Sequence, residues 1–203
     1  MMKPIFIGQE NSDYTTKLSW SSEENKIINV LRLADGFLQS ATVLSKQSME
    51  DENLQTKDVL IFPILANAHH GIELYLKVIN WMLNKILKNG NDFESGLDIM
   101  KLYLSISSKL NEFESKDDLN SFTAKTENLR SYIEELYPKI KTTLEQHIKE
   151  YSRYPFVLNF ENFFYHYFPG NVEIDLENFN TRFEEIHLSL KYIAEDYLNK
   201  TLR

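Results

Sequence analysis

The sequence predicts an all-α fold of about five helices, with a long aromatic-rich connection before the last of them. Apolar residues recur every three or four positions in several long segments, which is the spacing of one face of an α-helix. Capping residues precede some of these segments. The 203 residues are 42% hydrophobic, enough for one well-formed core. Residues 1–203 are therefore expected to form a single domain, with an N-terminal extension over residues 1–20.

The first two helices are predicted from capping and stop signals. Ser21-Ser22-Glu23-Glu24 has the pattern of a capping box and begins the first helix. Residues 48–56 are polar, as in a loop. The second helix is expected from about Asp58 or Pro63 to Lys88, where Asn89-Gly90 would stop it.

Three further helices are predicted toward the C-terminus. Ser95 is a candidate cap for the third, which ends near Ser115. A longer pattern begins at Asp118 and persists through Pro138, where a kink or a short break is expected. Asp175 would cap the last helix, which carries apolar residues at alternating steps of three and four. These residues are Leu176, Phe179, Phe183, Ile186, Leu190, Ile193 and Tyr197.

The second helix contains the most informative stretch of the chain, in which polar residues interrupt an apolar run. At about 100° per residue, His69, His70, Glu73 and Lys77 fall on one stripe. Gly71 lies on the opposite side, where it would permit the close approach of a neighbouring helix.

Two interpretations of the stripe remain open, and a third, the metal site, is disfavoured. It is a set of ordinary i,i+4 pairs on a half-exposed face, or a functional polar pocket in which Glu73 orients a histidine or holds a cation, or a metal site shared by His69 and Glu73. No other segment repeats a Glu-x-x-His or His-x-x-x-His pattern, so no metal site is expected.

Composition excludes several classes of protein. The absence of cysteine rules out disulfides and thiolate sites and is compatible with a reducing cytoplasm. The net charge of -8 opposes general attraction to phosphate or anionic lipid. The longest apolar run, residues 59–66, is far shorter than a membrane span. No glycine-rich phosphate loop occurs. We expect a soluble cytoplasmic protein without a cofactor and without a membrane partner.

An irregular aromatic-rich segment is expected over residues 152–174. Eight aromatic residues lie between Tyr154 and Phe168. Such density is found in platforms that stack bases. Because lysine and arginine are not interleaved with the aromatic residues, the segment is better interpreted as a small satellite core under a long connection. Two short strands within residues 156–167 are a further possibility.

The string Ala68-His69-His70-Gly71-Ile72-Glu73-Leu74-Tyr75-Leu76-Lys77 resembles the second helix of the HEPN superfamily of small helical-bundle proteins. The turn Ser152-Arg153-Tyr154-Pro155-Phe156 and the helix start Ile174-Asp175-Leu176 are similar to HEPN-like proteins of bacterial and phage defence, which makes Arg153 and Tyr154 candidate site residues. The resemblance implies an up-and-down bundle, usually dimeric, and in many members a metal-independent endoribonuclease.

The catalytic signature of those ribonucleases is an arginine followed, after four to six residues, by a histidine. Arg182 and His187 match it. The histidine would act as general acid or base and the arginine would stabilise the developing charge on phosphorus. However, Glu184 and Glu185 would repel an RNA phosphate. Arg182 and His187 are also about 140° apart around the helix, so they converge only through a dimer partner or a helix irregularity.

Two functions therefore remain open. The first is a non-catalytic or weakly catalytic HEPN-like module of a bacterial defence or toxin-antitoxin type system. Such a module would form a homodimer and bind a nucleotide, RNA or a cognate partner protein. The second is a metal-independent HEPN endoribonuclease that uses Arg182 and His187.

Overall fold

The computed structural model describes residues 26–90, 98–113, 116–139 and 173–201, together with Phe93 and Gly96. These residues contain six α-helices and no strand, which confirms the all-α prediction. The expected extension over residues 1–20, the capping box at Ser21 and the aromatic residues 154–168 lie outside the described residues.

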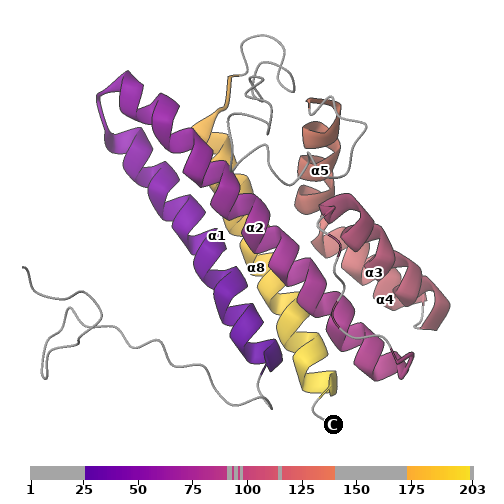
Figure 1. Cartoon of the computed structure of the whole chain (residues 1–203). Coiled ribbons are helices and arrows are strands. Elements are labelled where there is room, and N and C mark those ends of the chain that lie inside the picture. The colour runs from indigo at the N-terminus through magenta and orange to yellow at the C-terminus, as the bar shows by residue number, and fades with distance from the viewer. Residues whose placement is uncertain are drawn as a thin grey trace, which may run out of the picture.

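Three long helices form one side of the bundle: α1 (Lys26–Glu50), α2 (Leu54–Leu87) and α8 (Leu176–Thr201). They lie side by side and each packs against the other two (Figure 1). Contacts between α1 and α8 pair Met49 with Asn180 near one end and Asp35 with His187 further along, so α8 runs antiparallel to α1. Because α1 is also antiparallel to α2, α8 and α2 run in the same direction.

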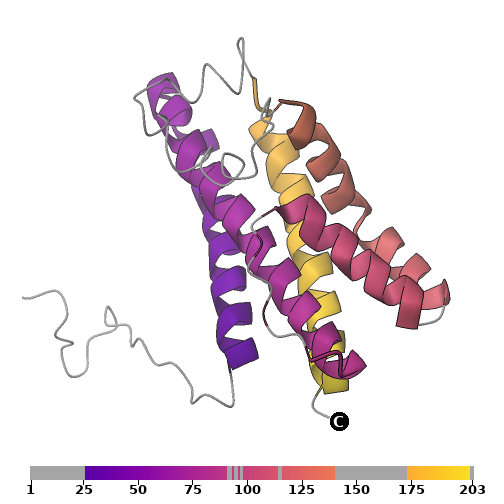
Figure 2. The same cartoon turned by 45° about the vertical axis from the view of Figure 1, so that its right-hand side comes forward.

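Three shorter helices form the other side: α3 (Ile99–Phe113), α4 (Lys116–Lys125) and α5 (Glu127–Lys139). Figure 2 shows them beyond α2 and α8, on the side away from α1. α3 packs against α2, and α5 packs against α8. The helix α2 therefore lies in the middle of the molecule, and many of its side chains are fully buried, among them Ile64, Ile72, Leu76, Ile79 and Met82.

α1 and α2 approach each other closely at Gly71, as the sequence predicts. A Cβ atom at this position would lie 2.6 Å from Cγ of Leu38 and 3.0 Å from the backbone nitrogen of Leu38. No side chain fits there without a shift of the Leu38 side chain or of α1. Gly71 therefore allows the two helices to approach each other over the centre of the bundle.

The boundary between α1 and α2 differs from the prediction. A polar loop was expected over residues 48–56, but α1 continues to Glu50 and α2 begins at Leu54. The side-chain oxygen of Asn53 accepts a hydrogen bond from the backbone N–H of Gln55 at 3.0 Å and so caps the new helix. Pro63 lies inside α2 and does not begin it. The end of α2 is as predicted, with Lys88 in the left-handed conformation at φ 51°.

The next helices also differ in detail. The helix expected from Ser95 begins at Ile99, and the carboxylate of Asp98 accepts hydrogen bonds from the N–H groups of Met100 and Lys101. The long helical pattern from Asp118 was expected to kink or break at Pro138. The structure breaks it at Thr126 instead, between α4 and α5. Both the N–H and the hydroxyl of Thr126 donate to the carbonyl of Phe122, which closes the last turn of α4.

The last helix is the element that the sequence predicts best. Asp175 caps α8, because its carboxylate accepts a hydrogen bond from the N–H of Asn178 at 3.0 Å. Six of the seven predicted apolar residues are buried: Phe179, Phe183, Ile186, Leu190, Ile193 and Tyr197. Leu176, in the first turn, is only partly buried.

Candidate functional site

The polar stripe of α2 contains a buried ion pair. Nζ of Lys77 donates to Oε1 of Glu73 at 2.8 Å, and the two side chains are only 7% and 5% exposed. The ring of His70 lies 3.4 Å from Oε2 of Glu73 and makes an edge contact with Phe37 of α1. His69 is also buried. Glu73 and Lys77 thus form an i,i+4 pair as one interpretation expects, but the pair is buried and does not lie on a half-exposed face.

Burial and pairing act in opposite directions on Glu73. Burial raises the pKa of its carboxyl. The hydrogen bonds from His70 and Lys77 and the charge of Lys77 lower this pKa, and together they outweigh burial, so the net pKa lies below its ordinary value. Glu73 therefore stays ionised inside the bundle. Among the described residues, no three histidine, aspartate or glutamate side chains gather in a way that could hold a metal ion.

The stripe continues at Asn80, which joins α2 to α3. Its side-chain N–H₂ donates to the carbonyl of Leu102 at 3.0 Å. Its side-chain oxygen accepts from the hydroxyl of Ser105 at 2.9 Å and from Nζ of Lys109 at 2.7 Å. These contacts satisfy the buried amide and position α3, so this part of the stripe is structural.

His187 belongs to a second polar cluster, formed by α1, α2 and α8. Its Nε2 lies 2.6 Å from Oδ1 of Asp35. The same oxygen accepts a hydrogen bond from the hydroxyl of Tyr75 at 3.2 Å, and Nζ of Lys191 lies 3.5 Å away. Gln39 donates to the other oxygen of Asp35 at 2.8 Å. The side chain of His187 is 15% exposed, so one edge of this cluster reaches solvent.

Asp35, Tyr75 and Lys191 belong to no sequence motif that marks them as site residues. Burial raises the pKa of Asp35, but the hydrogen bond and charge of His187, followed by the charge of Lys191, bring it below its ordinary value. Burial and the neighbouring Asp35 carboxylate raise the pKa of the Tyr75 phenol. Asp35 is therefore a fixed anion, and Tyr75 a fixed donor.

Arg182 has its contacts elsewhere. Its Nη1 donates to Oε1 of Glu135 on α5 at 2.7 Å. Its Nη2 is buried and has no hydrogen-bond partner among the described residues. Arg182 thus points toward α5 and His187 toward α1, so the described chain does not bring this predicted pair together. Arg153 and Tyr154 lie outside the described residues.

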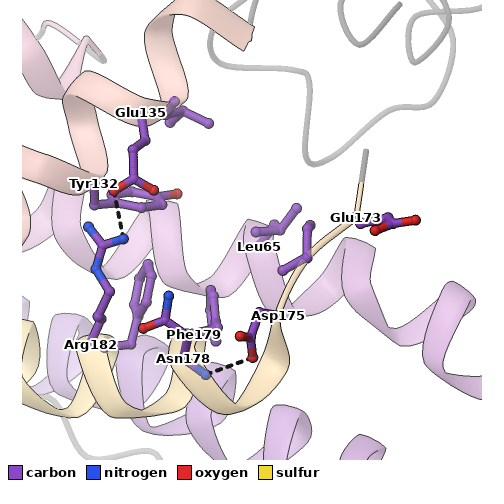
Figure 3. A pocket seen from close by; sticks show the side chains of 11 residues that line it. Leu65, Tyr132, Glu135, Glu173, Asp175, Asn178, Phe179 and Arg182 are labelled. Carbon is purple, nitrogen blue, oxygen red and sulfur yellow. Dashed lines mark hydrogen bonds and ion pairs between the residues drawn. The ribbon is translucent and has the colours of Figure 1, made fainter. Parts of the chain in front are cut away.

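A cavity of about 300 Å³ lies beside Arg182, between α5 and the first turns of α8, and we call it the α5–α8 cavity (Figure 3). Its described lining is mainly apolar and is formed by Leu65, Tyr132, Leu136, Ile174, Phe179 and Phe183. The remaining lining residues are Glu135, Glu173, Asp175, Asn178 and Arg182. The lining therefore combines apolar walls with three carboxylates and one cation.

Comparison with known proteins finds no family model, no curated protein and no solved structure that matches this chain. By length and composition alone, α1 and α2 are each apolar enough to cross a membrane. The uninterrupted apolar run of residues 59–66 therefore understates how apolar α2 is as a whole. The core helices of soluble proteins have the same property, and 56% of the apolar stretch of α2 is buried inside the bundle. The structure is compatible with a soluble protein.

Proposed function

We propose that this chain is a HEPN-like helical-bundle module of a bacterial defence or toxin-antitoxin type system. In this proposal it is cytoplasmic, forms a homodimer and binds a partner protein, and it does not itself cleave RNA. The HEPN assignment is supported by the string from Ala68 to Lys77, which lies on a central helix of an all-α bundle.

The contacts of Arg182 carry the non-catalytic part of the proposal. A catalytic arginine must direct its N–H groups at the phosphate that reacts. Here Nη1 donates to Glu135 at 2.7 Å, so the guanidinium is held toward α5. His187, the other member of the motif, is engaged by Asp35 on a different side of α8.

The charges favour a partner protein over a nucleotide or RNA. The chain carries a net charge of -8. The lining of the α5–α8 cavity carries three carboxylates, and its cation is already paired with one of them. A phosphate would be repelled both at long range and at the cavity itself.

RNA cleavage in the absence of metal tests the non-catalytic part. The purified protein in EDTA should leave total RNA intact. Cleavage that is lost in His187→Ala and retained in Glu184→Ala, an exposed neighbour on the same helix, would contradict the proposal. Light scattering tests the homodimer, which should have twice the 23.9 kDa of one chain.

A ribonuclease centred on His187 is the second candidate, and the contact of His187 with Asp35 favours it. A carboxylate that holds one ring nitrogen fixes the orientation of a histidine. Lys191 lies beside this pair, so it, rather than Arg182, would meet the phosphate. This candidate predicts RNA cleavage that Asp35→Asn, His187→Ala and Lys191→Met each lower and that Arg182→Lys leaves unchanged.

A further inference from the structure

We infer that the α5–α8 cavity binds the partner protein, and that it takes a peptide segment in which an apolar side chain is flanked by lysine or arginine. This inference rests on the proposed function and adds the place and the chemistry of the contact.

The size and walls of the cavity suit an apolar side chain. Its volume of about 300 Å³ is at the lower end of the range for small-molecule pockets, so it has room for one or two side chains of a peptide. The rings of Phe179 and Phe183 form part of the wall and stack at 4.1 Å between centroids. Both residues are buried and packed in the core of the bundle, so the wall is present before any ligand arrives.

The charge of the cavity suits a cation. Figure 3 shows the Arg182–Glu135 pair on one side and Glu173 and Asp175 on the other. The cation of the first side is balanced by Glu135, so the second side keeps two carboxylates. Asp175 uses one oxygen to cap α8, and both Glu173 and Asp175 are exposed. A lysine or arginine of the partner would be attracted to this rim, whereas a phosphate or an acidic peptide would be repelled.

The order of residues at the rim indicates the order in the partner. Ile174 stands between Glu173 and Asp175 and is 37% exposed, so an apolar side chain is accessible between two carboxylates. An acidic, apolar, acidic sequence matches a partner segment that is basic, apolar and basic. The apolar side chain of the partner would enter between Ile174 and Phe179, and its basic neighbours would meet the two carboxylates.

Two synthetic peptides test this inference by titration calorimetry. In the first peptide leucine alternates with arginine, and in the second every arginine is replaced by glutamate. The chain should bind the first peptide with one-to-one stoichiometry and with an affinity that falls as salt is added, and it should not bind the second.

A matched pair of double variants separates the cavity from the general negative charge of the protein. Glu173→Gln with Asp175→Asn removes the two rim carboxylates, and asparagine at position 175 still caps α8. Glu195→Gln with Asp196→Asn makes the same change of net charge at exposed residues farther along α8. The rim variant should weaken binding about tenfold, while the control should change it less than about twofold. Ile174→Ser should also weaken binding without affecting folding, because Ile174 is exposed and precedes the helix.

Three results would overturn the inference. They are equal binding by the two double variants, the absence of binding of the arginine peptide to the unmodified chain, and loss of the dimer in the rim variant, which would make a second copy the occupant. The proposed function fails separately, by metal-independent cleavage of RNA that depends on His187.

Discussion

The carboxylate of Glu73 accepts a hydrogen bond from the buried ammonium of Lys77, and removal of the carboxylate takes this acceptor away. The side chain of Lys77 is only 7% exposed, so in Glu73→Ala water cannot readily replace the lost carboxylate. The free energy of unfolding should therefore fall by about 3–5 kcal/mol. This expected loss is larger than the roughly 1–3 kcal/mol expected if the Glu73 network were only partly buried. Denaturant unfolding measures the loss, and Glu73→Gln should recover part of it.

Glu184→Ala is the control for this prediction. Glu184 pairs with Lys46 at 2.5 Å, but both side chains are about half exposed, so the change should cost under about 1 kcal/mol. If both Glu73 variants lost less than about 0.5 kcal/mol, Glu73 would not be the centre of a buried network.

Asp35 and Glu73 should both contribute to the acid dependence of stability. The pKa of each carboxyl is lower in the folded chain than its ordinary value. Each group therefore contributes stability that is complete above the unfolded-state pKa, near 4, and that is lost as the pH falls through the folded-state pKa. Unfolding midpoints measured from pH 7 down to pH 3 should decline below about pH 4, and the decline should be shallower in Asp35→Asn. A decline that is equally steep in this variant would contradict the assignment.

At the scale of helices, the contact of α1 with α2 depends on the absence of a side chain at Gly71. Gly71→Ala gains helix propensity, but its Cβ meets Leu38 at 2.6 Å, so the variant should lose about 1–3 kcal/mol. Gly36→Ala on α1 is the matched control, because a Cβ there has nothing within 4 Å, and it should gain up to about 1 kcal/mol. Thermal unfolding compares the two, and a loss in both variants would contradict the packing argument.

The elements that the sequence predicts well are those set by local signals. The cap and buried stripe of α8 both lie within its own residues, so the pattern from Asp175 to Tyr197 is sufficient to locate the helix. The break at Thr126 leaves no such signal. Phe122, Leu129 and Ile133 are all buried at steps of seven and four, so the apolar spacing continues across a turn of one residue.

The same distinction separates the two polar clusters. Glu73 and Lys77 are four residues apart on one helix, so the sequence predicts their contact directly. Asp35 and His187 are 152 positions apart and meet only because α8 packs against α1. No pattern in the sequence predicts that pairing. The sequence motif therefore identifies His187 as a candidate site residue but pairs it with Arg182. In the described chain Arg182 faces α5 instead.

For the molecule as a whole, the polar groups on α2 bear on whether the chain needs a membrane. Glu73 and Lys77 form a buried ion pair within α2, and Asn80 has partners on α3, so separating α2 from its neighbours in lipid would place the ion pair in hydrocarbon and remove the α3 partners of the amide. The purified chain should remain in the supernatant after high-speed centrifugation without detergent. Recovery only from the pellet, with release by detergent, would contradict this prediction.

The close approach of α1 and α2 at Gly71 also constrains which substitutions related sequences can carry. Leu38 fills the space that any larger residue at position 71 would need, so the two positions cannot vary independently while α1 and α2 keep their spacing. Relatives with alanine or serine at position 71 should carry a smaller residue at position 38, and relatives with a large residue at position 71 should hold the two helices further apart. Gly36, which has open space around it, is free to change on its own.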